Sequence, residues 1–275
     1  MNPSFACLNE ESVGDQYKGM PILEKMKMSY EKLEELRKEL HRSNEDNISE
    51  ERIPRSLKFQ ECLNQLSKET QLLADWIECC FDEFHTLAVD QKSLLFSNFL
   101  PVFIIFERTF MTSKFGKKNQ LLLSSGDFVE IDKLEKFFTD EEKGICGKQM
   151  AELFQSSVKL YDTLYNLLST ENLDLFEFFT LTVLLLWDHG LVGQSEECMS
   201  SSKRMKSVIA KEYTHYQKYF KNKDNPTTEI AVKVPILTCL QRVSNRLRGD
   251  MSVSHVFDYF TMPENAISTF VGRYS

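Results

Sequence analysis

The most extended pattern in the chain is an amphipathic stretch that becomes apolar on all sides between Leu72 and Gly116. A short polar turn, Asp90-Gln91-Lys92, separates its two halves. The run after the turn, residues 94–106, is apolar at nearly every position, and a helix of that kind must be buried all round. The pattern therefore predicts a helix through the middle of the core. In the first half, apolar residues three or four positions apart share one helical face: Leu73, Trp76, Ile77, Cys80, Phe84 and Leu87.

The remainder of the chain predicts further helices joined by polar segments. Residues 1–20 are polar and loose in pattern, and 43–54 read as a polar loop that ends where the next helix begins, near Pro54. A short hairpin is expected at 120–131. Gly190 is expected to cap the end of the helix over residues 173–187. The other helical patterns cover residues 21–41, 147–169, 173–187, 195–219 and 228–260.

This arrangement resembles the ligand-binding domain of nuclear hormone receptors. Their signature places an aromatic residue, a Phe and a Leu at helical spacing before Asp-Gln and Leu-Leu. The continuation FLPVFIIFERTF resembles the large nematode-type branch, which also carries a proline at the place of Pro101, although a proline inside a helix normally costs about 3 kcal/mol. The resemblance covers residues 21–275 and implies an all-α, three-layer antiparallel helical sandwich with at most a small β-turn. The signature positions are filled by Trp76, Phe84, Leu87, Asp90-Gln91 and Leu94-Leu95.

Composition narrows the classes of partner. The net charge is −8 and the pI about 5.3, whereas a domain that grips nucleic acid by itself is usually basic. The seven cysteines show no CxxC pair, which suits a reducing compartment and excludes the four-cysteine zinc modules with which receptors read DNA. No signal peptide is visible, and no apolar run is expected to reach the ~20 residues that cross a bilayer. We therefore expect no direct nucleic acid or membrane binding by this chain, and the resemblance implies a nuclear protein.

Enzyme motifs are absent from the sequence. There is no phosphate-binding glycine loop, no HExxH and no GxSxG elbow. The five histidines are scattered and none stands at metal-ligand spacing from a cysteine or carboxylate. We expect no catalytic residue, no metal site and no cofactor.

Two charged residues, Glu107 and Arg108, directly follow the buried run. Burying a charge is costly unless it is paired, so one interpretation gives each a structural partner on a neighbouring helix. The other gives Arg108 an acidic ligand head group, because receptors place an arginine near this point. The structural interpretation is favoured.

The resemblance also implies a pocket for an apolar ligand such as a fatty acid. Aromatic and Met linings are adaptable and suit lipids, although such residues more often fill a core. The candidate lining residues are Trp76, Cys80, Phe103, Phe106, Arg108, Met111, Leu164 and Val256.

In receptors a short C-terminal helix folds against the domain. A Glu on that helix and a Lys on the third helix together hold the two ends of an LxxLL coactivator helix. Here Thr269 stands where the Glu belongs, and Glu78 or Cys79 where the Lys belongs, so weak LxxLL binding is expected.

Residues 228–260 are the implied surface for a homo- or heterodimer. The resemblance implies ligand-responsive or constitutive regulation of transcription. The alternative functions are a helical interaction scaffold without ligand and an intracellular lipid carrier. The candidate coregulator groove comprises Lys92, Leu95, Phe96, Ile267, Thr269 and Phe270.

Overall fold

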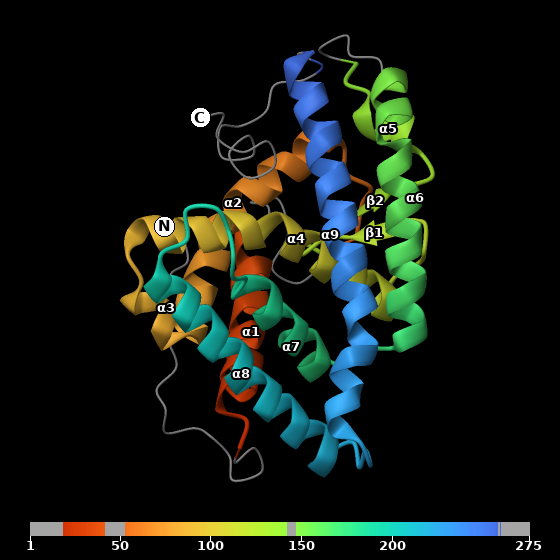
Figure 1. The fold of residues 1–275 in the computed structure, drawn as a ribbon. Coiled ribbons are helices and arrows are strands. Elements are labelled where there is room, and N and C mark those ends of the chain that lie inside the picture. The colour runs from red at the N-terminus through yellow and green to blue at the C-terminus, as the bar shows by residue number, and fades with distance from the viewer. Residues whose placement is uncertain (1–18, 42–52, 142–146, 258, 260–275) are drawn as a thin grey trace. The chain divides into compact units, whose positions relative to one another are not determined.

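The computed structural model of the chain describes residues 19–41, 53–141, 147–257 and 259. Within those ranges the fold is all-α, as predicted, with one small antiparallel hairpin (Figure 1). The helices are α1 (Pro21–Leu40), α2 (Phe59–Cys80), α3 (Asp82–Thr86), α4 (Val89–Phe115), α5 (Leu134–Phe138), α6 (Lys148–Glu171), α7 (Leu175–Leu186), α8 (Glu196–Tyr219) and α9 (Pro226–Val256), and the strands are β1 (Gln120–Leu122) and β2 (Phe128–Glu130).

The described residues form two compact units. Unit 1 takes residues 19–36, Gln71–Phe103 and Asn172–Thr238, and unit 2 takes Arg37–Thr70, Ile104–Glu171 and the chain from Cys239 onward. Helices α1, α2, α4 and α9 each contribute residues to both units.

Unit 1 is built around an aromatic cluster. The Tyr30 ring lies 5.7 Å from Trp76 and 5.5 Å from Phe179 in edge-on arrangements. The Phe103 ring lies 5.5 Å from Trp76 and stacks 4.9 Å from Phe99. The Trp76 indole N–H also donates to the Ser29 hydroxyl at 3.1 Å, so its one polar atom is satisfied inside the core. The six residues of the predicted apolar face between Leu73 and Leu87 are all buried.

Unit 1 also buries a carboxylate at the start of α1. Glu212 of α8 accepts hydrogen bonds from the backbone N–H groups of Ile22 and Leu23, at 3.1 and 3.0 Å. These N–H groups belong to the first turn of α1 and have no partner within that helix. Burial raises the pKa of Glu212 to about 7, even though both hydrogen bonds act to lower it. The carboxylate caps α1 at a cost in desolvation.

Helix α4 is the predicted central helix. Leu95, Phe99, Phe103 and Phe106 along it are fully buried, and Pro101 lies within it without ending it. By length and composition alone this helix could cross a membrane, contrary to our expectation that no run would be long enough. The protein itself buries 61% of its most apolar window, however, which is the behaviour of a core helix.

The start of α2 differs from the prediction. The helix begins at Phe59 rather than near Pro54, because the preceding backbone joins the hairpin. The Leu57 N–H donates to the Phe128 carbonyl at 2.9 Å, and the Phe128 N–H donates to the Arg55 carbonyl at 3.1 Å. Pairing with β2 holds this segment extended, so the helix begins later in the sequence than predicted.

Two local boundaries were also predicted wrongly. Asp90, Gln91 and Lys92 lie inside the first turns of α4, and the break comes earlier, at the extended residues Phe81 and Leu87 that flank α3. An acidic residue in the first turn of a helix is favourable, so the polar triplet starts the helix instead of interrupting it. Gly190 does not cap α7, whose C-cap is Trp187; it adopts φ +91° in the turn that follows.

Candidate functional site

Unit 2 contains an apolar cavity of about 190 Å³. Its walls come from six parts of the unit: α2, α4, the hairpin with the chain after it, α5, α6 and α9. The lining residues are Phe59, Cys62, Leu63, Leu66, Ile104, Ile105, Arg108, Thr109, Leu121, Val129, Ile131, Leu134, Phe137, Phe138, Phe154, Ser157, Val158, Tyr161, Val243, Leu247 and Met251.

Two polar side chains on this lining, Ser157 and Thr109, already have hydrogen-bond partners. The Ser157 hydroxyl donates to the buried Asp250 carboxylate at 2.6 Å, and Arg246 pairs with the same carboxylate at 2.9 Å. The Thr109 hydroxyl donates to the Ile105 carbonyl of its own helix at 2.6 Å. Burial raises the pKa of the Tyr161 phenol, so that group stays neutral. These side chains shape the wall and bring no charge into the cavity.

Arg108 is the charged residue of this lining. Its side chain is half-buried in the cavity wall, and its guanidinium forms no hydrogen bond or ion pair with any described residue. Its positive charge does act on Cys62, also in the wall, and on Glu69. Burial nonetheless raises the pKa of the Cys62 thiol to about 12, so this cysteine is a neutral apolar wall residue and not a nucleophile.

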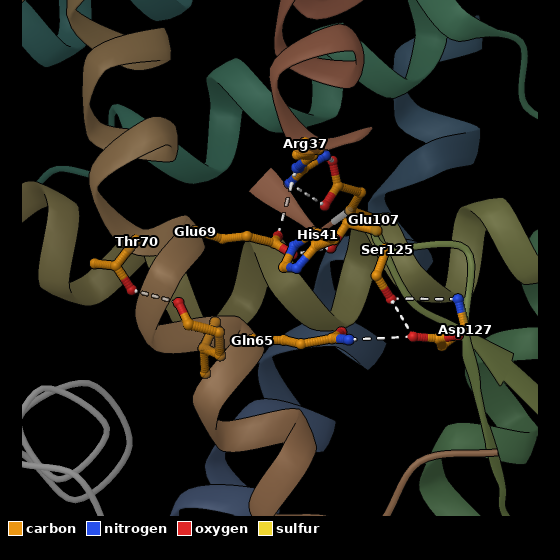
Figure 2. Close-up of polar contacts among 10 residues, drawn as sticks. Arg37, His41, Gln65, Glu69, Thr70, Glu107, Ser125 and Asp127 are labelled. Atoms are coloured by element: carbon orange, nitrogen blue, oxygen red, sulfur yellow. Dashed lines mark hydrogen bonds and ion pairs between the residues drawn. The ribbon is translucent and has the colours of Figure 1, made fainter. Parts of the chain in front are cut away.

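A buried charge network occupies another part of unit 2 (Figure 2). Arg37 of α1 binds Glu107 of α4 through two parallel hydrogen bonds of 2.8 and 2.9 Å, and its Nε lies 3.4 Å from Glu69 of α2. His41 Nε2 lies 2.6 Å from the other Glu69 oxygen, which also accepts a hydrogen bond from Ser124. Burial acts to raise the pKa of Glu69, but Arg37 and His41 outweigh it and hold the value at about 2.

This network settles one of the two charged residues that follow the apolar run. Glu107 has a structural partner on a neighbouring helix, as the favoured interpretation held. For Arg108 the described residues offer no such partner.

The structure brings only one of the predicted lining residues, Arg108, to the cavity. Trp76, Cys80 and Phe103 are packed in the core of unit 1, where the Cys80 thiol lies 3.1 Å from the Ser29 hydroxyl. Phe106 and Leu164 are fully buried in unit 2, Met111 is half-buried, and Val256 near the end of α9 is 69% exposed.

Sequence reasoning missed most of the wall. Cys62, Leu63 and Leu66 continue the apolar stripe of α2 toward its start, where the pattern was visible but not followed. Phe154 and Tyr161 belong to the stripe of α6 from which only Leu164 was chosen. The part of the wall formed by α5 could not be predicted from hydrophobic periodicity, because a five-residue helix is too short to show a period.

The candidate coregulator groove is described only in part. Lys92 forms an ion pair with Glu78 at 3.4 Å, and its ammonium lies 6.0 Å from the centre of the Phe84 ring. Leu95 is fully buried, and Phe96 is half-buried. The other three candidates lie outside the described residues: Ile267, Thr269 and Phe270.

No group of three or more His, Cys, Asp or Glu side chains suited to a metal ion occurs among the residues that the structure describes. Those residues therefore offer a cavity and a charge network, and no metal centre.

The sequence matches the family described as the ligand-binding domain of nuclear hormone receptors over residues 47–257. The chain belongs to this family, whose helical sandwich agrees with the predicted fold class. It is 39% identical over 254 residues to nuclear hormone receptor family member nhr-12 of Caenorhabditis elegans, covering 91% of this chain and 56% of that relative. The corresponding values for nhr-16 of the same organism are 33% over 258 residues, with 93% and 66% covered.

These relatives confirm the resemblance to the nematode-type branch. A third relative, nhr-86 of Caenorhabditis elegans, is 32% identical over 261 residues, with 93% of this chain and 64% of the relative covered. The chain thus spans between about half and two thirds of the length of these curated relatives. The family is one of receptors rather than enzymes.

Proposed function

We propose that this chain is the ligand-responsive part of a transcription regulator and that it acts in the nucleus. Membership of the receptor family supports the class of function, and the apolar cavity of unit 2 supports binding of a small hydrophobic molecule. An apolar cavity of about 150 Å³ is already large enough to hold benzene. The cavity here, at about 190 Å³, suits a small apolar molecule or one end of a longer chain.

Arg108 carries the finer proposal, that the ligand is acidic. Leaving a guanidinium in an apolar wall without an ion-pair partner among the described residues is costly, and a carboxylate would bind it through two hydrogen bonds. A medium-chain fatty acid combines that head group with a tail that the apolar lining accepts. Helix α4 would hold the arginine in place, since Arg108 lies well inside that helix.

Native mass spectrometry of the purified protein, repeated after denaturation, tests the first proposal. A discrete extra mass that leaves on unfolding would support an occupied cavity, and its identity would name the ligand class. A clean protein mass that added fatty acids leave unchanged would contradict ligand binding and favour a scaffold that acts through partner proteins alone. Release of a lipid from a protein that remains outside the nucleus would favour a carrier.

The Arg108→Ala variant tests the acidic head group. Titration with decanoate by calorimetry should show at least about tenfold weaker binding than in the wild type, because one charge-assisted contact contributes roughly 1.5 to 3 kcal/mol. Decanol, which lacks the carboxylate, should bind both proteins alike. Lys68→Ala, which removes an exposed base of α2, is the matched control. Unchanged decanoate binding by Arg108→Ala would end the anchor proposal and leave the apolar cavity standing.

We further propose that coregulator proteins and a homo- or heterodimer partner bind this chain, as in its family. Residues 228–260 are the proposed dimer surface, and within unit 1 the α9 residues Val232 and Val234 are each about half exposed. Direct contact with nucleic acid is not proposed, because the chain carries a net charge of −8. Analytical ultracentrifugation of wild type and Val232→Asp would test the dimer surface.

A further inference from the structure

From Ser200 to its end, helix α8 presents a basic face on an acidic chain, while its first turn carries the exposed Glu196 and Glu197. The only acidic residue between Ser200 and Tyr219 is Glu212, which is buried against α1. Because the chain as a whole carries a net charge of −8, this face is a local reversal of sign. Every exposed residue in the stretch is a serine, a base or a tyrosine: Ser200, Lys203, Arg204, Ser207, Lys211, Lys218 and Tyr219.

The bases of this face lack acidic partners within the described part of the chain. Lys203, Arg204, Lys211 and Lys218 form no ion pair there; the Lys218 ammonium lies 4.9 Å above the Tyr219 ring. Nearby Lys206 is different, because it pairs with Asp188 at 3.6 Å.

Lys221, just beyond the helix, likewise binds Asp174 at 2.6 Å. These neighbouring lysines thus have acidic partners, whereas the four bases of the exposed row form no ion pair with a described residue. A solvated lysine is ordinary, but four unpaired bases on one helical face form a continuous positive strip.

The spacing of the strip is regular. Arg204, Lys211 and Lys218 follow one another at intervals of seven residues, which is two helical turns and about 10.5 Å. Over seven residues an α-helix returns to within about 20° of the same direction, so the three side chains form a nearly straight row. Lys203 lies beside Arg204 at one end of this row.

A row of this pitch matches a second helix that carries carboxylates at the same interval. Helix α8 packs against α7 on its inner side (Figure 1), and Met205, Ile209 and Tyr213 fill that buried face. The basic row is on the opposite, exposed side. Nucleic acid fits less well, because phosphates follow one another at about 3.4 Å along each strand and the rest of the chain would repel them.

We propose that the basic row of α8, formed by Lys203, Arg204, Lys211 and Lys218, docks an acidic helical segment of a partner protein. Charge complementarity on such a surface sets the rate of association and the choice of partner more than it sets affinity. The proposed interaction is therefore reversible and sensitive to salt. The row shares no residue with the lining of the cavity in unit 2.

The probe for the test is a fluorescein-labelled, alanine- and glutamine-based peptide with glutamates at seven-residue intervals on one face. Its binding to the full chain is followed by fluorescence anisotropy. Arg204→Glu/Lys211→Glu/Lys218→Glu should weaken binding by about tenfold or more, because three attractions become repulsions. The neutral triple variant with Gln at the same positions should give an intermediate loss, and raising the salt to about 150 mM should weaken wild-type binding.

A matched control separates the row from net charge. Lys68→Glu/Lys148→Glu/Lys159→Glu changes the net charge equally, at exposed lysines of α2 and α6. It should leave binding within about twofold of wild type, because those lysines lie outside the row. Circular dichroism melting of each variant checks that it is folded.

Four results would overturn the proposal. They are an equal loss in the control variant, equal binding of a peptide with the same glutamates scattered around its helix, no binding to wild type at low salt, and tighter binding of duplex DNA than of the peptide. The last result would assign the row to nucleic acid instead.

Discussion

Glu212 is a residue whose ionisation should limit stability at neutral pH. Its pKa in the folded protein is about 7, above the value of about 4.5 for an exposed glutamate, because burial disfavours the charged form. The folded state therefore holds the proton more tightly than the unfolded state. The stabilisation this provides is complete below about pH 4.5 and is lost as the pH rises through 7.

Glu212→Gln tests this directly. The amide keeps an oxygen that can accept from the N–H groups of Ile22 and Leu23 but carries no charge. Between pH 5 and 8 the wild type should lose roughly 1 to 3 kcal/mol relative to the variant, as measured by urea unfolding. Parallel pH profiles for the two proteins would contradict the assignment.

The Arg37–Glu107 pair is expected to behave as a buried unit. Arg37→Met removes the cation that binds Glu107 through two hydrogen bonds, and breaking a buried ion pair by removing one partner costs about 3 to 5 kcal/mol. The double variant Arg37→Met/Glu107→Leu removes both charges and should recover part of that loss. Urea unfolding of the two single variants and the double variant gives the coupling energy, and additive losses would show that the pair does not act as a unit.

At this scale the sequence showed which residues mattered better than it showed their partners. Glu107 and Arg108 were recognisable as charges beside a buried run. In the structure Glu107 forms a buried ion pair, whereas Arg108 lies in the cavity wall. The partner Arg37 lies 70 positions away, and nothing in the local pattern selects it over the other bases of the chain. The cavity wall was similarly hard to predict, because an apolar stripe marks a buried face without distinguishing filled core from cavity.

The helices themselves were largely predictable from periodicity. Helices α1, α6, α7, α8 and α9 start within two residues of their predicted first positions, and the hairpin lies where it was expected. Errors occurred where tertiary pairing overrode local pattern, as where strand β2 holds the residues before α2 extended. The short helices α3 and α5 gave no usable period and went unpredicted.

The candidate coregulator surface, with Lys92, Leu95 and Phe96 among its residues, should bind LxxLL peptides weakly. Lys92 is already paired with Glu78, and Leu95 is fully buried, so the exposed surface offers neither a free lysine nor that leucine. The clamp glutamate is replaced by Thr269, outside the described residues. Fluorescence polarisation should give a Kd weaker than about 0.1 mM, or less than about 5.5 kcal/mol of binding free energy. Binding in the low micromolar range, lost with a scrambled peptide, would refute this.

For the whole molecule, the nuclear receptor family and the all-α class could be inferred from the sequence and are confirmed. The domain extent of 21–275 stays a prediction, because the family match covers residues 47–257 and begins after α1. The cavity's place in unit 2 could not have been read from the sequence, since its walls come from six separate segments.

Helix α4 has a consequence for the order in which the protein is made. Phe103 packs against Phe178 of α7, which leaves the ribosome 75 residues later (178 − 103). At 5 to 20 residues per second, that delay is about 4 to 15 seconds. During this time a helix apolar enough to cross a membrane has been synthesised without its later neighbours. We therefore expect the newborn chain to be most prone to aggregation before α7 has been made.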